Sequence, residues 1–237
     1  MLTLLALHVC LTFLLPVPGC GSGYLGPGGW AMNQTFYTCT GGAAGYIDRM
    51  ILSENHLYQH SQVKKLYHSP LPHDPEGILG CLTSIFLVFL GLQAGKILIT
   101  YPSWKSRVAR WCVWGLLCGI VAGWLCKFSK EDGVIPINKN LWSVSYILAM
   151  SGTAYLLLSL LYITIDVEAW WSGAPFFYPG MNSILVYVGH ELTHGLFPWF
   201  WLCSETHYCY LSMNLWATSL WVIIAFILYR KGFFLSI

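Results

Sequence analysis

Four side chains able to do chemistry lie in an otherwise apolar stretch, PGMNSILVYVGHELTH at 179–194; they are Asn182, His190, Glu191 and His194. Glutamate and histidine are costly inside a bilayer unless they are paired or hydrated, so such residues there usually mark functional sites. The His-Glu-x-x-His spacing also places two imidazoles on one helix face with a carboxylate general base beside them, as in zinc proteases. The stretch therefore predicts either a polar site at membrane depth or a zinc site.

A catalytic zinc site needs a third protein ligand in addition to His190 and His194, and a fourth position for water. Among His, Asp and Glu, the other apolar segments offer only His8. Phe197 and Phe200 stand where the metzincin motif continues with glycine and histidine. An intramembrane zinc protease remains an alternative interpretation, but we expect no metal.

The composition predicts a membrane protein. The 237 residues are 56% hydrophobic and only 9% charged, with a mean hydropathy of +0.59, whereas about 25% of the residues in soluble domains are charged. The formal net charge of +2 and the absence of a basic run give no indication of nucleic-acid binding. The lipid bilayer is the partner that this composition predicts.

The chain divides into apolar segments of about 20 residues, the length needed to span a bilayer as a helix. We predict an all-α, polytopic transmembrane helix bundle that forms a single domain over 1–237. The run 1–15 is short and lacks the basic start of a signal peptide, so it is interpreted as part of a transmembrane helix. A loop rich in Gly and Pro follows at 16–77, and five full spans are expected within 78–231, at about 78–101, 108–126, 141–165, 179–202 and 213–229.

The basic residues predict an orientation. Lys105, Arg107 and Arg110 make one short connector the most basic in the middle of the chain, so the positive-inside rule places that connector in the cytosol. Alternation of the spans then puts 16–77, 127–140 and 203–212 in the lumen.

The loops assigned to the lumen carry two signals of an oxidising, glycosylating compartment. Cys20 and Cys39 flank a Gly-rich loop, and Cys203 and Cys209 flank a polar one; either pair could form a disulfide there. Sequence alone does not fix their connectivity. Asn33 begins an Asn-Gln-Thr glycosylation acceptor sequence.

Several interrupted polar motifs together resemble one known family. They are DPEGILG at 74–80, GLQAGKIL at 91–98, IPINKNLWSVSY at 135–146 and APFFYPGMNSILVYVGHE at 174–191. They are similar to the C-terminal half of the heparan-alpha-glucosaminide N-acetyltransferase family. The resemblance implies a multi-pass lysosomal membrane protein that transfers acetyl from cytosolic acetyl-CoA to the terminal glucosamine of heparan sulfate in the lumen.

Under this resemblance, Asn182, His190 and Glu191 are expected to line the central cavity, where an imidazole and a carboxylate could orient the acceptor amine or take its proton. The alternative is a buried hydrogen-bonded cluster that only holds helices together. The resemblance also implies that polar residues near the lumenal ends of the helices bind the acceptor sugar.

Two such groups are candidates for binding the sugar. Asn138, Lys139 and Asn140 could hold hydroxyl or sulfate groups, although helix capping would also explain them. Asp74 and Glu76 could bind the glucosaminium charge. The pattern Asp-Pro-Glu-Gly equally predicts a helix start, with Asp74 as the N-cap.

Lys96, Lys105 and Arg107 are the candidates for binding the phosphates of acetyl-CoA. Each also has an ordinary explanation, because Lys96 can snorkel to the interface and the other two are topology signals.

The chain departs from the family in one respect that bears on activity. The family's proposed catalytic histidine lies upstream of every matched motif, so we expect this chain to be inactive alone. The alternative is a non-catalytic membrane subunit or regulator that associates with itself or with a full-length relative. Four histidines of the 16–77 loop would be largely protonated in an acidic compartment if their pKa values stay near 6.5; they are His56, His60, His68 and His73.

Overall fold

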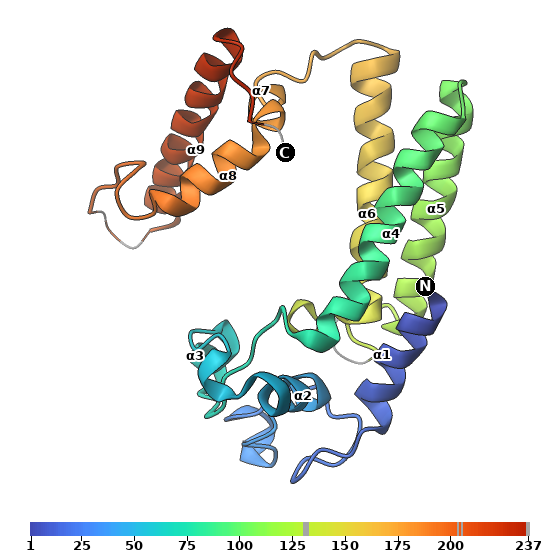
Figure 1. The fold of residues 1–237 in the computed structure, drawn as a ribbon, viewed down its shortest axis with the longest axis vertical. Helices are drawn as coiled ribbons and strands as arrows, with labels where there is room; N and C mark the ends of the chain where they lie inside the picture. The colour runs from blue at the N-terminus through green and yellow to red at the C-terminus, as the bar shows by residue number, and fades with distance from the viewer. Residues whose placement is uncertain (130–132, 203, 205, 236–237) are drawn as a thin grey trace. The chain divides into compact units, whose positions relative to one another are not determined.

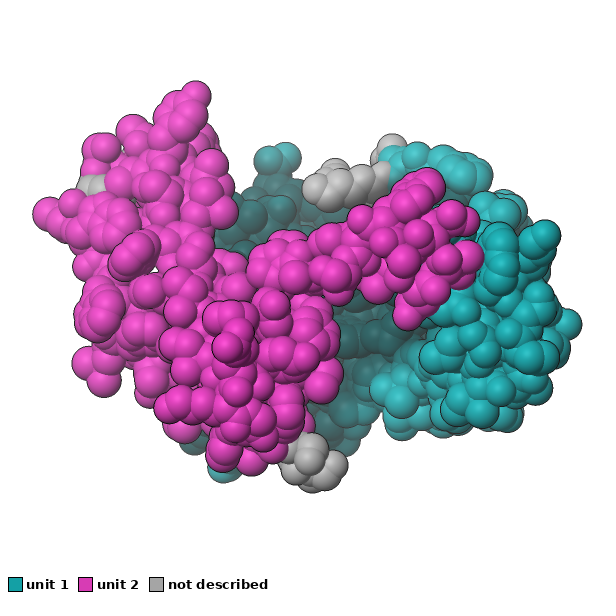
Figure 2. Space-filling model, turned by 90° about the horizontal axis from the view of Figure 1, so that it is seen from above, with its two compact units in different colours: residues 1–163 teal, residues 164–237 magenta. Residues whose placement is uncertain are grey.

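The computed structural model describes residues 1–129, 133–202, 204 and 206–235, and the regular elements within them are all helical. The chain forms two compact units, Met1–Ile163 and Thr164–Ile237 (Figure 2). Each unit is described by itself.

Four helices in the described residues are long and apolar enough to cross a bilayer. They are α4 (Ile78–Thr100), α5 (Trp104–Leu125), α6 (Val144–Tyr162, extended by a π-helical turn at Ile163–Val167) and α9 (His207–Arg230) (Figure 1). The shorter apolar helix α1 (Leu2–Leu14) has 13 residues and is about 20 Å long. The predicted all-α polytopic membrane fold is therefore confirmed.

The segment predicted as a fifth span is not one continuous helix. It contains α7 (Phe177–Met181) and α8 (Ser183–Leu192), and the ten residues of α8 extend only about 15 Å. Asn182 separates the two helices with a non-helical backbone (φ −127°, ψ 36°). Gly195 adopts a left-handed conformation (φ 83°) three residues after α8, and Pro198 follows. These residues explain why the apolar run does not continue as a helix.

Helices α4, α5 and α6 form the core of the first unit (Figure 1). Glycines allow α5 and α6 to approach closely, since a Cβ at Gly152 would lie 2.9 Å from the carbonyl oxygen of Gly115. Two aromatic side chains inside the bundle donate hydrogen bonds to backbone carbonyls. The Trp111 indole N–H donates to the Ala94 carbonyl at 3.2 Å, and the Tyr155 hydroxyl donates to the Leu90 carbonyl at 2.7 Å.

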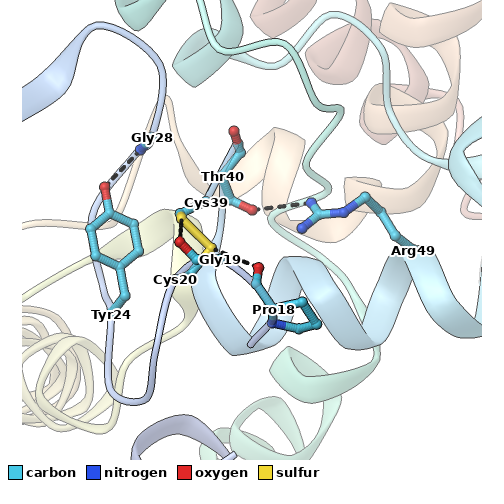
Figure 3. The surroundings of a disulfide bond; sticks show 8 residues. All are labelled: Pro18, Gly19, Cys20, Tyr24, Gly28, Cys39, Thr40 and Arg49. Carbon is cyan, nitrogen blue, oxygen red and sulfur yellow. Dashed lines mark hydrogen bonds between the residues drawn. A yellow bond between two sulfur atoms is a disulfide. The ribbon is translucent and has the colours of Figure 1, made fainter. Parts of the chain in front are cut away.

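The remaining elements of the first unit cap the end of this bundle at which α4 begins (Figure 1). They are α2 (Gly42–Leu52), α3 (Gln62–Tyr67) and three 3₁₀ turns at Ala31–Gln34, Glu54–His56 and Lys139–Leu141. Cys20 and Cys39 form a disulfide in this region, with their Cα atoms 5.7 Å apart (Figure 3). The Arg49 guanidinium donates to the Thr40 carbonyl at 3.1 Å and to the Pro72 carbonyl at 3.4 Å. Arg49 thus ties the disulfide loop to the segment that leads into α4.

The start of α4 corrects the prediction for Asp74. The helix begins at Ile78, and Asp74 instead accepts the backbone N–H of Glu76 at 2.9 Å in a local turn. Asp48 of α2 caps the helix, because its Oδ1 accepts the Ile78 N–H at 2.8 Å. A residue 30 positions away therefore does what the local Asp-Pro-Glu-Gly pattern predicts for Asp74.

Candidate functional site

A small pocket lies in the capping region of the first unit, and it is called the polar pocket below because an imidazole and two amides line it together with apolar residues. Its volume is about 150 Å³, and its lining includes Leu25, Gly41, Tyr67, His73, Asn138 and Asn140. These residues come from the Gly-rich loop, the N-terminus of α2, the end of α3, the approach to α4 and the turn before α6. Segments far apart in the sequence thus meet around one cavity.

His73 supplies the imidazole of this pocket. Its side chain is 2% exposed, and its Nε2 lies 2.9 Å from the carbonyl oxygen of Asn140. Because a carbonyl oxygen can only accept, Nε2 carries the proton and Nδ1 of the neutral ring is an acceptor. Nδ1 is buried and has no hydrogen-bond partner among the described residues.

Burial lowers the pKa of His73 below its ordinary value, and the hydrogen bond to Asn140 opposes this only in part. The prediction that this loop histidine is protonated in mild acid therefore needs correction. Burial makes His73 harder to protonate than an exposed histidine, whereas His56, His60 and His68 are exposed.

An adjoining apolar pocket shares Leu25, Gly41, Asn138 and Leu141 with the polar one. Its lining also includes His8 of α1, whose two ring nitrogens are buried without partners in the described structure. The space open to solvent-sized molecules is about 20 Å³, enough for roughly one water. Two buried imidazoles, His8 and His73, thus line neighbouring cavities.

The structure places Asn138 and Asn140 in the polar pocket, while Lys139 is exposed. Asn138 also has the capping role considered above, since its Oδ1 accepts the Asn140 N–H at 2.9 Å. Ser143 caps α6, accepting the Tyr146 N–H at 3.2 Å, so α6 begins three residues later than the predicted span. Asp74 and Glu76 do not line the pocket, and Glu76 is exposed.

Asn182, His190 and Glu191, all in the second unit, do not form a common cluster. Asn182 is 0% exposed, and its amide holds the C-terminal segment by donating to the Phe233 carbonyl at 2.9 Å and accepting the Leu235 N–H at 3.0 Å. His190 and Glu191 have side chains 53% and 59% exposed, with Nδ1 and Oε1 3.7 Å apart. Asn182 therefore holds the C-terminal segment within the second unit, and it does so without the exposed His190 and Glu191.

The His-Glu-x-x-His motif has only part of a zinc-site geometry. The rings of His190 and His194 are 6.5 Å apart, centre to centre. In the parts of the chain that the structure describes, no group of three His, Cys, Asp or Glu residues could hold a metal ion. The motif thus lacks a third ligand among these residues.

A wider, basic groove lies at the other end of the α4 to α6 bundle, beside the turn between α4 and α5. Its volume is about 480 Å³, and Lys96 and Arg110 line it together with Tyr101 and Trp114. Arg110 lies over the ring of Tyr101, 3.8 Å from its centroid. The groove therefore presents two cations from two helices beside aromatic rings.

Of the three predicted cofactor residues, only Lys96 lines this groove. Arg107 instead ties helices together, donating to the Tyr101 carbonyl and the Tyr162 hydroxyl, each at 2.6 Å. Lys105 lies 5.6 Å from the centroid of the Trp104 ring. The prediction missed Arg110, although it belongs to the same basic cluster of the sequence.

The chain is similar to known enzymes. No family model matches the chain. Over its whole length, however, the chain is 52% identical to human and 51% identical to mouse heparan-alpha-glucosaminide N-acetyltransferase. The chain is a homologue of these enzymes. It matches a C-terminal portion of them and spans 36% of their length.

The homology to heparan-alpha-glucosaminide N-acetyltransferase confirms the resemblance inferred from the polar motifs. Those motifs contain Lys96, Asn138 and Asn140, which line the groove and the pocket. Sequence reasoning missed His73 as a pocket residue, and its only signal was its position directly before the DPEG motif.

Two other predictions concern the Gly-rich loop and the 203–212 loop. Asn33 is exposed, so a glycan on this residue would not require local unfolding. Cys203, one half of the second proposed disulfide, lies outside the described residues.

Proposed function

We propose that this chain forms part of a membrane N-acetyltransferase that passes acetyl from cytosolic acetyl-CoA to a terminal glucosamine of heparan sulfate in the lysosomal lumen. The observation that carries the proposal is the identity of 51% and 52% over the whole chain to enzymes named for acetyl transfer to heparan glucosaminide.

The basic groove supports a donor site for acetyl-CoA. Lys96 and Arg110 can pair with phosphates, and the neighbouring Trp114 offers an aromatic surface to an adenine ring. The positive-inside rule assigns this end of the bundle to the cytosol, where the donor would be found.

The polar pocket supports an acceptor site at the opposite end. Helix α4 has 23 residues, a length of about 35 Å, and it separates the groove from the pocket by roughly the thickness of a bilayer. Asn138 and Asn140 supply amide groups suited to sugar hydroxyls. An enzyme whose two substrates lie in different compartments needs a binding site at each end of its helix bundle.

The chemistry also requires a base. In the proposed transfer the acceptor ammonium loses a proton, the free amine forms a C–N bond to the acetyl carbon, and the C–S bond breaks to release the CoA thiol with the second amine proton. We propose that the catalytic group for this step lies in the portion of the relatives that this chain does not span. The chain alone is then inactive.

The test is reconstitution in proteoliposomes. The chain is supplied alone, or together with the remaining portion of the human relative, with acetyl-CoA outside and a glucosamine glycoside inside. We expect acetylated product only from the pair. Acetylated product from the chain alone would refute the proposal that it is inactive. If the two portions associate but give no acetylated product, acetyl transfer is refuted and a non-catalytic subunit is favoured.

A further inference from the structure

The two cations of the basic groove have no anionic partner among the described residues. No carboxylate in the described part of the chain forms an ion pair with Lys96 or Arg110. Arg107 differs, because its guanidinium donates to the Tyr101 carbonyl and the Tyr162 hydroxyl. Charges within a transmembrane segment are costly when unpaired and usually mark a functional site. The groove therefore offers two positive charges to an anion from outside the chain.

Both cations lie a short way below the ends of their helices. Lys96 precedes Thr100, the last residue of α4, by four positions, and Arg110 follows Trp104, the first residue of α5, by six. At 1.5 Å per residue, these positions are about 6 Å and 9 Å from the helix ends. The polar layer on each side of the hydrocarbon core is about 5 to 8 Å thick. The two cations are therefore close to the boundary between lipid headgroups and acyl chains.

The groove is open on a side of the bundle that faces lipid. Lys96 and Arg110 are exposed, and Val113 in the lining is 55% exposed. Leu92 and Ile99, four and three positions from Lys96 and so on the same side of α4, are 59% and 87% exposed. Exposed apolar side chains on a membrane-spanning helix contact acyl chains. A lipid molecule can therefore enter the groove sideways from the bilayer.

The order of chemical groups along the groove matches the parts of a phospholipid. Lys96 and Arg110 can bind a phosphate. Gln93, one turn deeper than Lys96 on the same face of α4, has an amide N–H that can donate to a glycerol ester carbonyl. Trp114, one turn deeper than Arg110 on α5, presents an apolar ring to an acyl chain. The volume of about 480 Å³ lies within the 300 to 1,000 Å³ typical of ligand sites.

We propose that the basic groove binds the headgroup of an anionic phospholipid, with the lipid phosphate between Lys96 and Arg110. The positive-inside rule assigns this leaflet to the cytosol, where the membrane surface is negatively charged. The lipid site depends on the groove alone, but its consequence for catalysis rests on the proposed function. Because acetyl-CoA needs the same two cations for its own phosphates, lipid and donor exclude each other. The lipid composition of this leaflet then regulates access of the donor to the groove.

Native mass spectrometry of the full chain, released from detergent micelles, measures lipid binding directly. The chain is titrated with phosphatidylserine or with phosphatidylcholine, in which a quaternary ammonium group cancels the phosphate charge. We expect one phosphatidylserine per chain and weaker binding of phosphatidylcholine. Lys96→Gln and Arg110→Gln should each raise the Kd for phosphatidylserine about tenfold, or about 1.4 kcal/mol, since each loses a charge-assisted hydrogen bond.

Matched controls separate the groove from overall charge and from folding. Lys105→Gln removes the same charge at a lysine outside the groove and should leave the Kd unchanged. Lys96→Arg keeps the charge and should bind phosphatidylserine as the unmodified chain does. Melting curves show whether each variant is folded. Inorganic phosphate is added in parallel, and it should not displace the lipid at equal concentration, because it has no acyl chains to occupy the apolar part of the groove.

Three results would overturn the inference: equal Kd values for the two lipids, equal losses of affinity in Lys105→Gln and Lys96→Gln, or displacement of phosphatidylserine by an equal concentration of inorganic phosphate. The last result would indicate a site for a free anion.

Addition of CoA distinguishes failure of the inference from failure of the proposed function. We expect CoA to displace phosphatidylserine from the unmodified chain. Phosphatidylserine that binds through Lys96 but is not displaced by CoA would support the lipid site and refute a donor site in the groove. CoA binding without phosphatidylserine binding would refute the lipid site and leave the donor site.

Discussion

The Asp48 carboxylate accepts the first backbone N–H of α4, at Ile78, over 2.8 Å, and so joins the capping region to a membrane-spanning helix. Gly77 lies against this carboxylate, and a Cβ there would clash with it. Burial raises the pKa of Asp48, since the carboxylate is desolvated. The carboxylate is thus used as a hydrogen-bond acceptor in a place that is unfavourable for its charge.

Replacing Asp48 should separate the contribution of its hydrogen bond to Ile78 from the cost of burying its charge. Asp48→Ala should lower the free energy of unfolding by about 1 kcal/mol, because a helix N-terminal N–H loses its acceptor. Asp48→Asn should be close to neutral, because the amide oxygen keeps the bond and the charge is lost. Thermal melting and hydrogen exchange of the Ile78 amide measure both effects. An Asn variant as unstable as the Ala variant would contradict the capping role.

Removing the disulfide should loosen the capping region. Cys20 and Cys39 are 19 positions apart, and a loop of that size is expected to contribute roughly 3 kcal/mol to stability. Cys39→Ser should lower the melting temperature and reduce its sensitivity to reductant. Cys81→Ser, at an exposed free cysteine, is the control and should respond to reductant as the unmodified chain does. Equal melting of all three proteins would contradict this prediction.

The basic groove gives a prediction for donor binding. Lys96→Gln and Arg110→Gln should each weaken CoA binding about tenfold or more, because a charge-assisted hydrogen bond contributes about 1.5 to 3 kcal/mol. Lys105→Gln, which changes a lysine outside the groove, should have little effect. Isothermal titration with CoA at two salt concentrations is the measurement. Loss of affinity in Lys105→Gln equal to that in Lys96→Gln would show that overall charge, and not the groove, binds CoA.

The buried state of His73 predicts how stability depends on pH. Because its pKa is lower in the folded chain than the ordinary 6.5, the unfolded chain takes up the proton more readily. The stability that neutral His73 contributes is fully present above about pH 6.5 and is lost as the pH falls toward its folded pKa. Arg49 deepens the shift and Asp74 opposes it.

We therefore expect the melting temperature of the unmodified chain to fall between pH 7 and pH 5 more than that of His73→Gln. His60→Gln should keep the full dependence. Asp48 acts with the opposite sign, since its raised pKa makes protonation stabilising, but it is the same in every variant compared. A pH dependence unchanged in His73→Gln would show that this imidazole is not held neutral by the fold.

The sequence predicts the long helices well, because a bilayer demands runs of apolar residues whose length and composition are local properties. The break at 179–202 was not predictable from hydropathy. It depends on Asn182, whose amide binds a segment 51 and 53 positions away. Such a contact has no signature in the residues that surround Asn182.

The candidate site residues also divide into those that the local sequence indicates and those whose role depends on a distant contact. The sequence indicates Lys96, because a lysine near the end of a span is conspicuous. It also indicates Arg107 as a cofactor residue, although this guanidinium donates to the Tyr162 hydroxyl 55 positions away. The sequence does not distinguish His73 from three exposed histidines, because the residue that it contacts, Asn140, lies 67 positions later. Residue type could be read from the sequence, whereas the partner that decides the role of each residue could not.

The disulfide loop has a consequence for biosynthesis. Both cysteines precede α4, and the bridge involves only residues before α2. Once Cys39 has emerged from the translocation channel into an oxidising compartment, the bridge can close while the later transmembrane helices are still being synthesised. Arg49 can then bind the Thr40 carbonyl beside an already closed loop. The part of the capping region that precedes α4 can therefore mature during translation, ahead of the bundle that it covers.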